Sequence, residues 1–453
     1  MTTLGTIDVV AGVSPKIHEN LFRPSMQALV KPLLGCIADD ITGATDLALM
    51  LGRNGMPVVL YIGLPEEVGM EPDAEAVVIA LKSRSSPASE AVAASVTAAR
   101  WLRKRGVRQL FFKYCSTFDS TDAGNIGPVA ETLRDETGAA LVPVCPAFPA
   151  NSRTVYQGHL FVGTQLLSES SMRHHPLTPM TDANLVRILG RQLRFPETAG
   201  LVPLATVERG PAAVCKKFRE LVREGKRFAV TDALTDAHLF TLGEACSDLP
   251  LLTGASGLAM GLPANFRNAG LLESIRGLVD IDRSSDPALV LAGSCSSTTR
   301  AQVKYMAEKY PALAFEPLAF SQGRQSIGDI LDWALKRMAS GPVLIYSSAL
   351  PDDVAAVQSE LGRQHAGELV ENALAEIAIG LSAEGFRKLV VAGGETSGAV
   401  LTSLGIRRLR IGPEIAPGVP WTVSMDTPRV LLALKSGNFG SDDFFTKALE
   451  MVT

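Results

Sequence analysis

The stretch LLGCIADDITGATDLALMLGRN, residues 33–54, decides the fold. Its apolar run Leu33–Ala38 is typical of a strand that is buried on both faces, and apolar residues recur at helical spacing within Leu47–Leu51. Between these two segments stands the carboxylate pair Asp39 and Asp40. Ligands of an open parallel sheet bind beyond the carboxyl ends of the strands, where helix N-termini also point. Two adjacent acids need a cation or a hydroxyl between them, so this turn is the first candidate for substrate chemistry.

The composition predicts two globular domains without a nucleic-acid or membrane partner. A length of 453 residues exceeds one ordinary core, while 46% hydrophobic and 20% charged residues are typical of a globular protein. A net charge of −4 without a basic, aromatic-rich stripe argues against nucleic-acid binding. No apolar stretch is long enough to cross a bilayer. The six cysteines show no CxxC spacing, which favours a reduced, cytoplasmic protein over a disulfide scaffold or a metal cluster.

The same alternation of strand and helix continues along the chain. Helical spacing over Pro87–Arg105 lies between short apolar runs that are typical of buried strands. Such alternation predicts a mostly parallel, doubly wound α/β sheet. Further strands are expected at Pro57–Gly63, Ala76–Leu81, Val107–Phe112, Ala139–Val144, Gly200–Ala205, Arg227–Thr231 and Pro250–Thr253.

A polar segment divides the chain into two doubly wound α/β domains. We expect an N-terminal extension at residues 1–32, a first domain at 33–280, a linker at 281–287 and a second domain at 288–453. Both sheets are predicted to be mostly parallel. The segment Thr154–Pro179, which includes His159, His174 and His175, is interpreted as an irregular surface excursion.

Cations, hydroxyls and carboxylates follow the third, fourth and fifth predicted strands. Because parallel strands end at one edge of the sheet, these loops should meet the Asp39–Asp40 turn there. Arginine or lysine can bind a carboxylate, bidentately in the case of arginine, while acids and amides can bind hydroxyls. This inventory suits a small polyhydroxylated acid. The residues concerned are Lys82, Arg84, Lys113, Ser116, Thr117, Asp119, Ser120, Asn125 and Arg153.

Glycine-rich turns follow strands in the second domain. In RKLVVAGGETSGAVLTSLG, residues 387–405, a buried strand runs through Gly393-Gly394 into a helix. Glycines allow the backbone to approach a ligand, and the helix N-terminus offers unpaired N–H groups to a phosphate. Plain turn chemistry is the alternative, because no standard nucleotide motif matches. The turn after Leu434 and the hydroxyl-rich turn at Ser294 favour a phosphate site, since three loops can converge at one sheet edge.

Several long motifs resemble the four-carbon acid sugar kinases. They are IADDITGATD (37–46), GNIG (124–127), GSCSSTT (293–299), AGGETSG (392–398), IGPEIAPGVPW (411–421) and LKSGNFGSDDFF (434–445). The resemblance implies an N-terminal domain for the sugar acid and a C-terminal domain for the nucleotide, with the active site in the cleft between the domains. Many members carry KxDSTxRGN after the fourth strand, whereas this chain has KYCSTFDSTDAGN at 113–125, without the arginine. This departure is similar to the 3-oxo-tetronate kinase branch, which implies ATP-dependent phosphorylation of the O4 hydroxyl of 3-oxo-tetronate (3-dehydro-erythronate).

The resemblance and the loop positions together assign roles to residues. Asp40 is the expected general base, with Asp119 as the second choice. ATP and Mg²⁺ are expected as cofactors, although no metal ligand is assigned, and a homo-oligomer is left open. Residues expected to bind the sugar acid are Asp39, Thr42, Gly43, Lys82, Arg84, Lys113, Ser116, Thr117, Ser120, Asn125 and Arg153. Those expected to bind ATP are Ser294, Gly393, Gly394, Glu395, Thr396, Ser397, Gly437 and Asn438.

Other readings of the same residues stay open. One of the two adjacent acids can be a helix cap. Asp119 can be a solvated loop acid, and Lys82 and Arg84 can be surface charges. The chain can also be a D-threonate or D-erythronate 4-kinase. A hydroxy-acid lyase or isomerase would use the paired carboxylates to abstract a proton. A ligand-binding regulator would show no turnover at all.

Overall fold

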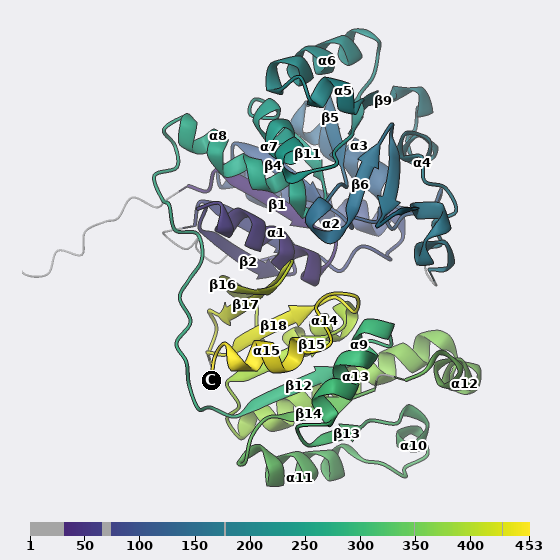
Figure 1. Cartoon of the computed structure of the whole chain (residues 1–453), viewed down its shortest axis with the longest axis vertical. Coiled ribbons are helices and arrows are strands. Elements are labelled where there is room, and N and C mark those ends of the chain that lie inside the picture. The colour runs from purple at the N-terminus through teal and green to yellow at the C-terminus, as the bar shows by residue number, and fades with distance from the viewer. Residues whose placement is uncertain (1–30, 66–73, 176–177, 348, 428) are drawn as a thin grey trace, which may run out of the picture.

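The computed structural model of the chain describes residues 31–65, 74–175, 178–347, 349–427 and 429–453 (Figure 1). The predicted N-terminal extension at 1–32 therefore lies almost entirely outside the described residues. The described chain forms an N-terminal half, residues 31–270, and a C-terminal half, residues 288–453, stacked along the long axis of the molecule (Figure 1). No helix in these ranges has both the length and the apolar character needed to cross a membrane.

Eight parallel strands form the sheet of the N-terminal half. They are β1 (Leu34–Ala38), β2 (Val58–Ile62), β3 (Ala76–Ala80), β4 (Gln109–Lys113), β5 (Val142–Cys145), β9 (Ala199–Val202), β10 (Phe228–Thr231) and β11 (Leu251–Gly254). Their order across the sheet is β2-β3-β1-β4-β11-β5-β10-β9. Strand β1 is fully buried and pairs with β3 on one side and β4 on the other, so the winding direction changes there. The crevice for a ligand is thus expected at the carboxyl ends of these three strands.

Helices connect these parallel strands and cover the sheet. The helix α2 (Ala88–Lys104) is followed by Gly106, whose φ of +88° suits glycine after a helix. The other helices are α1 (Ile41–Arg53), α3 (Ile126–Thr137), α4 (Leu185–Gln192), α5 (Leu204–Val207), α6 (Pro211–Arg223), α7 (Asp236–Ala245) and α8 (Leu262–Asn268). The 3₁₀ helices are η1 (Pro149–Asn151), η2 (Leu167–Glu169), η3 (Ser171–His174), η4 (Pro196–Thr198) and η5 (Ser256–Gly261).

The segment predicted to be an irregular surface excursion is largely ordered, so that interpretation is wrong. It contains a three-stranded antiparallel sheet of β6 (Arg153–Tyr156), β7 (His159–Val162) and β8 (Gln165–Leu166). The turn between β6 and β7 has positive φ at both Gln157 (49°) and Gly158 (70°). The buried carboxylate of Asp232 accepts hydrogen bonds from the N–H groups of both turn residues, at 2.8 and 2.9 Å. A distant side chain therefore stabilises this hairpin.

The C-terminal half repeats the α/β pattern. Its parallel strands are β12 (Ala288–Ala292), β13 (Ala312–Ala314), β14 (Val343–Tyr346), β15 (Lys388–Ala392) and β18 (Leu431–Lys435), in the order β13-β14-β12-β15-β18. Its helices are α9 (Ser297–Ala307), α10 (Pro317–Ser321), α11 (Ile327–Met338), α12 (Pro351–Leu361), α13 (Arg363–Ala383), α14 (Gly394–Ser403) and α15 (Phe444–Glu450). The change of winding direction at β12 places the turns after β12 and β15 side by side.

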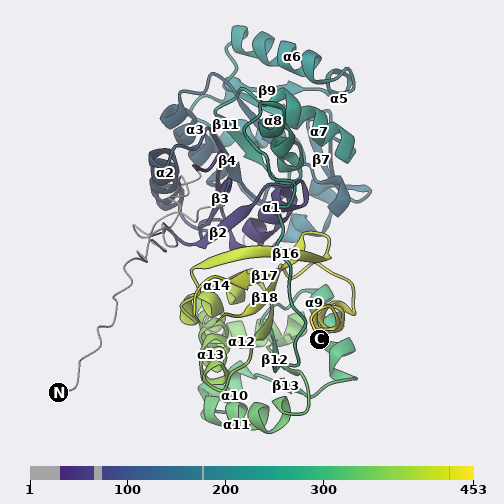
Figure 2. The ribbon, with the colours of Figure 1, turned by 90° about the vertical axis from the view of Figure 1, so that its left-hand side faces the viewer.

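An antiparallel hairpin joins the two halves into one sheet. It consists of β16 (Arg408–Ala416) and β17 (Val419–Ser424), and lies between the halves (Figure 2). Strand β17 pairs with β18, and β16 pairs with β2 of the N-terminal half. The described residues thus form one fifteen-stranded sheet, β13-β14-β12-β15-β18-β17-β16-β2-β3-β1-β4-β11-β5-β10-β9. The predicted α/β class with two mostly parallel units is confirmed, and the sequence did not reveal this junction.

A segment without helix or strand connects the halves along one side of the molecule (Figure 1). It includes the predicted linker at 281–287 and crosses the hairpin, where the N–H of Val279 donates to the carbonyl of Ile411 at 2.8 Å. The domain boundaries themselves stay a prediction.

Candidate functional site

The N-terminus of α1 presents the paired acids at the carboxyl end of β1. Asp40 is the N-cap: its carboxylate accepts from the N–H of Gly43 at 3.1 Å and from the hydroxyl of Thr42 at 2.7 Å. Asp39 is 4% exposed and accepts two hydrogen bonds from Arg84, both at 2.8 Å. Arg84 also contacts Asp40 at 2.5 Å, and Lys113 lies 3.6 Å from the same oxygen. Two cations thus hold the two acids together, and the capping acid is Asp40.

The charges within this cluster decide its protonation states. Burial acts to raise the pKa of Asp40, but Arg84 and Lys113 outweigh it and hold that pKa well below its usual range. Burial lowers the pKa of Arg84, while Asp39 and Asp40 more than compensate and raise it well above its usual range. Asp40 is therefore a carboxylate at neutral pH and Arg84 is a guanidinium.

Only some residues of the loop after β4 lie near these acids. Asp119 accepts a hydrogen bond from the hydroxyl of Thr117 at 2.6 Å. Ser120, by contrast, accepts from the amide of Gln192 at 2.9 Å. The amide of Asn125 donates to three backbone carbonyls of the loop that carries Arg84, at 2.8, 3.3 and 3.1 Å. Asn125 therefore stabilises the position of the arginine loop.

The turns of the C-terminal half face this edge of the sheet. Gly393 has a φ of +128°, which an L side chain rarely adopts, and α14 begins at Gly394. Ser397 is buried and its hydroxyl donates to the carbonyl of Gly393 at 2.7 Å. A methyl group built on Gly394 would lie 3.9 Å from the hydroxyl of Thr42 and 4.0 Å from the carboxylate of Asp40. The paired acids and the double-glycine turn are therefore neighbours.

A cavity of about 310 Å³ lies between the two halves. Ion pairs connect its sides, because Lys82 contacts Glu371 at 3.3 Å and Glu395 at 2.7 Å. Lining residues from the N-terminal half include Asp39, Asp40, Thr42, Lys82, Arg84, Ser116, Thr117, Asp119, Arg153, Met172, His175 and Thr178. Lining residues from the C-terminal half are Gly394, Glu395, Gly398, Ser436, Asn438 and Phe439. The predicted position of the active site, in the cleft between the halves, agrees with this arrangement.

Some predicted site residues do not line this cavity. Gly43 and Lys113 instead line a small adjoining cavity of about 40 Å³. Ser120 and Asn125 line neither cavity, so the structure does not support direct substrate contacts for them. The remaining predicted ATP residues, Ser294, Gly393, Thr396, Ser397 and Gly437, form the turns behind the lining without being part of it.

Two groups of site residues were missed in the sequence. Met172, His175 and Thr178 reach the cavity from the segment interpreted as a surface excursion, and no sequence signal indicated this. Asp46 lines the small cavity, and one of its oxygens accepts a hydrogen bond from Ser256 while the other has no partner among the described residues. Burial raises the pKa of Asp46 to about 7, against the opposing effects of Lys113 and Ser256. In the sequence, the only indication that Asp46 belongs near the site was its position at the end of the motif IADDITGATD (37–46).

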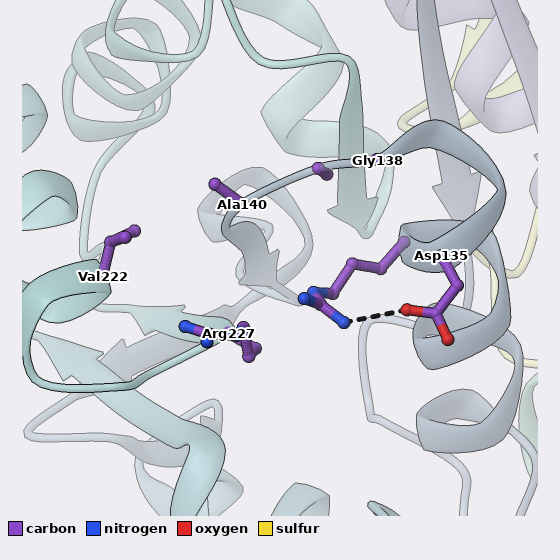
Figure 3. Close-up of a pocket in the computed structure, with 7 residues that line it drawn as sticks. Asp135, Gly138, Ala140, Val222 and Arg227 are labelled. Atoms are coloured by element: carbon purple, nitrogen blue, oxygen red, sulfur yellow. Dashed lines mark hydrogen bonds and ion pairs between the residues drawn. The ribbon is translucent and has the colours of Figure 1, made fainter.

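A second cavity, of about 400 Å³, lies at the other end of the strands (Figure 3). It is lined by residues at the end of α3 and before β5 and β10, including Asp135, Gly138 and Arg227. Arg134 forms an ion pair with its neighbour Asp135 at 2.9 Å. This cavity adjoins the amino ends of parallel strands, whereas ligands bind at the carboxyl ends, so the cavity between the halves is the better candidate.

Comparison with protein families matches both halves of the chain. Residues 34–262 match a sugar-binding N-terminal domain, and residues 289–445 match a nucleotide-binding C-terminal domain. The chain belongs to the four-carbon acid sugar kinase family. The family resemblance inferred from the motifs is thereby confirmed.

Members of this family with assigned names match over nearly their whole length. A 3-oxo-tetronate kinase from Cupriavidus necator is 55% identical over 429 residues, which is 93% of this chain and 98% of the relative. A 3-oxo-tetronate kinase from Pseudomonas fluorescens is 56% identical over 426 residues, which is 92% of this chain and 97% of the relative. Among solved structures, the Haemophilus influenzae protein HI1011 is 41% identical with a TM-score of 0.74, covering 92% of this chain and 100% of that one.

Proposed function

We propose that the chain is an ATP-dependent kinase that phosphorylates the O4 hydroxyl of 3-oxo-tetronate, giving the 4-phosphate. The observation that carries the proposal is the cavity between the halves, where a sugar-binding half with cations and hydroxyls faces the glycine turn of a nucleotide-binding half. The names of relatives at 55–56% identity support the choice of substrate. A cytoplasmic location is part of the proposal.

Arg153 is the cation that suits the carboxylate of the sugar acid best. Arg84 already donates to Asp39 and Asp40, so two of its nitrogens are occupied. Arg153 lines the cavity, and its guanidinium donates through Nη1 to the carbonyl of Asn151 without pairing with a carboxylate in the described part of the chain. A planar guanidinium can give a carboxylate two parallel hydrogen bonds. The hydroxyls of Ser116 and Thr117 on the same wall suit the substrate hydroxyls.

The N-terminus of α14 suits the phosphates of ATP. The first turn of a helix has N–H groups without intrahelical partners, and the helix dipole favours an anion there. Gly394 and Glu395 of this turn line the cavity opposite Asp40, together with Asn438 from the turn after β18. The terminal phosphate would thus lie beside the acids at the N-terminus of α1.

The residues of the cavity fit a nucleotide-borne Mg²⁺. Mg²⁺ is commonly bound by one or two carboxylates together with phosphate oxygens and water. Asp40 and Asp119 both line the cavity and offer carboxylate oxygens. The described residues contain no cluster of three or more side chains able to hold a metal by themselves, which agrees with an ion shared with the phosphates. When bound, Mg²⁺ neutralises charge on the transferred phosphoryl group.

Asp40 is the proposed general base. Its Oδ2 lies 4.0 Å from the position of a methyl on Gly394, at the N-terminus of the helix proposed to bind the phosphates. Arg84 and Lys113 keep Asp40 ionised, so it can orient the hydroxyl and receive its proton late in the transfer. Asp119 remains the second choice, because it lines the same cavity and already accepts from Thr117.

The test is a screen of four-carbon sugar acids and their 3-oxo forms with ATP and Mg²⁺, measured as ADP release. We expect ADP release with 3-oxo-tetronate and little with D-threonate or D-erythronate. A preference for the reduced acids would replace the proposed substrate with the alternative one. Conversion of the acid without ADP formation would indicate a lyase or an isomerase.

A further inference from the structure

Lys435 is a buried lysine at the carboxyl end of β18, directly before the turn that contributes Asn438 to the cavity. Its side chain is 0% exposed, and no carboxylate forms an ion pair with it in the described part of the chain. Burying a charge without a counter-charge is costly, so such a lysine needs a compensating function or partner. Its hydrogen bonds indicate what this function is.

The ammonium of Lys435 helps to hold one backbone carbonyl. The carbonyl oxygen of Gly437 accepts from Lys435 Nζ at 3.0 Å, from Thr299 Oγ1 at 2.9 Å and from Ser296 Oγ at 2.6 Å. Lys435 also donates to Thr299 Oγ1 at 3.0 Å. Three donors on one carbonyl fix the orientation of the peptide group between Gly437 and Asn438.

The orientation of this peptide decides where its N–H points. In a trans peptide the C=O and the following N–H point in opposite directions. Because the carbonyl of Gly437 points to the buried donors, the N–H of Asn438 points away from them, and Asn438 lines the cavity between the halves. This N–H makes no hydrogen bond within the described residues. It is therefore available to a ligand.

We propose that Lys435 is a positioning residue of the nucleotide site, which with Ser296 and Thr299 aims the N–H of Asn438 at a phosphate oxygen and places a buried positive charge behind it. The inference rests on the proposed nucleotide site. Lys435 does not touch the ligand itself. It acts through the peptide group that it holds and through the field of its charge.

The protonation of Lys435 should respond to the nucleotide. Burial lowers its pKa to about 7. The groups packed around the ammonium are the hydroxyls of Ser296 and Thr299, the Gly437 carbonyl and the ring of Phe444, none of which titrates near neutral pH. Asp443, at the start of α15, accepts from Ser441 instead. A bound polyphosphate favours the ammonium form and raises this pKa, so ATP binding at pH 8 should take up a proton.

The test is calorimetric titration of the full chain with ATP and Mg²⁺ at pH 8, in buffers of different ionisation enthalpy. The wild type is expected to take up about one proton per ATP beyond the uptake of Lys435→Met, since the two proteins differ only in this titratable group. Lys435→Met should weaken ATP binding about tenfold to a hundredfold, the range for loss of a charged hydrogen bond. Its KM for the sugar acid should not change.

Lys388 provides a matched control. It is also a buried strand lysine, 1% exposed, but it lies at the amino end of β15, where it donates to the carbonyl of Ser284. Lys388→Met should bind ATP with wild-type affinity and wild-type proton uptake. If Lys435→Met does not fold, Thr299→Val carries the test, because it removes one donor and an acceptor of Lys435.

The outcomes separate this inference from the proposed reaction. Wild-type ATP affinity and proton uptake in Lys435→Met, or wild-type affinity in Thr299→Val, would overturn the role of Lys435. Normal ATP binding without ADP release from any four-carbon sugar acid would overturn only the proposed reaction. A chain that does not bind ATP at all would overturn both.

Discussion

Replacing Gly43 by alanine should damage the site more than the fold. Gly43 lies in the first turn of α1, between the capping Asp40 and Lys113. A methyl group on Gly43 would lie 1.8 Å from Lys113 Nζ and 2.3 Å from Asp40 Oδ1. Both distances are far below van der Waals contact, so the ammonium and the carboxylate must move apart. The ion pair between Lys113 and Asp40 is then lost.

The opposing energies can be compared. Overpacking costs about 1–3 kcal/mol, and separating a largely buried ion pair adds a cost of similar size. Alanine in place of glycine gains about 1 kcal/mol of helix propensity. The net effect of Gly43→Ala is a destabilisation of about 3 kcal/mol. Because a displacement of about 1 Å at a reacting group can cost a hundredfold in rate, we expect kcat to fall about a hundredfold.

The measurements are the kcat for ADP release and the melting temperature. Gly367→Ala is the matched control, since Gly367 is exposed within α13 and a methyl there meets nothing within 4 Å. The control should raise the melting temperature through helix propensity and leave kcat unchanged. If Gly43→Ala behaved like the control in both measurements, the geometry of Asp40 and Lys113 would have no part in catalysis.

Four further substitutions test the roles of individual groups. Asp40→Asn still caps α1 but loses its ion pairs with Arg84 and Lys113, so its melting temperature should fall, while kcat falls at least about a hundredfold, in the range for general acid–base catalysis. A larger loss of kcat in Asp119→Asn than in Asp40→Asn would make Asp119 the base. Arg153→Lys should raise the KM for the sugar acid about tenfold through loss of bidentate geometry, while the KM for ATP stays unchanged. Equal changes in the two KM values would refute the role of Arg153 in binding the carboxylate. Asp46 has a pKa of about 7 in the folded protein, against an ordinary value of 3.8. Between these two pH values the folded protein binds more protons than the unfolded protein, so the free energy of unfolding falls as pH rises through this window. From pH 5 to 8 the wild type should lose about 3 kcal/mol more than Asp46→Asn, and equal slopes of stability against pH would contradict the assignment.

The strand–helix units and the central pairing of the site could be predicted from the sequence. Local periodicity identified β1 and α1, and the rule that parallel strands end at one edge brought Arg84 and Lys113 to Asp40. The double glycine at Gly393 was recognisable as a turn that only glycine accommodates well. These features depend on residues close in sequence or on topology alone.

The missed features depend on contacts between distant residues. The pairing of β2 with β16 joins two sheet edges, and neither strand carries a signal for its partner. The hairpin from β6 to β7 has Gln157 where asparagine is preferred, and the distant Asp232 compensates by binding the turn. Asp46 was missed for the same reason, because its hydrogen-bond partner Ser256 lies more than two hundred residues later in the chain.

The continuous sheet also determines how the cavity can open. Strands β2 and β16 are joined by backbone hydrogen bonds, whereas the ion pair of Lys82 with Glu395 joins side chains that are 62% and 52% exposed. An exposed ion pair contributes about 1 kcal/mol or less, so parting it costs little compared with breaking a strand pairing. Parting this exposed pair would therefore widen the cavity, while the sheet keeps the N-termini of α1 and α14 facing each other. The junction that the sequence did not reveal is thus what keeps Asp40 opposite Gly394.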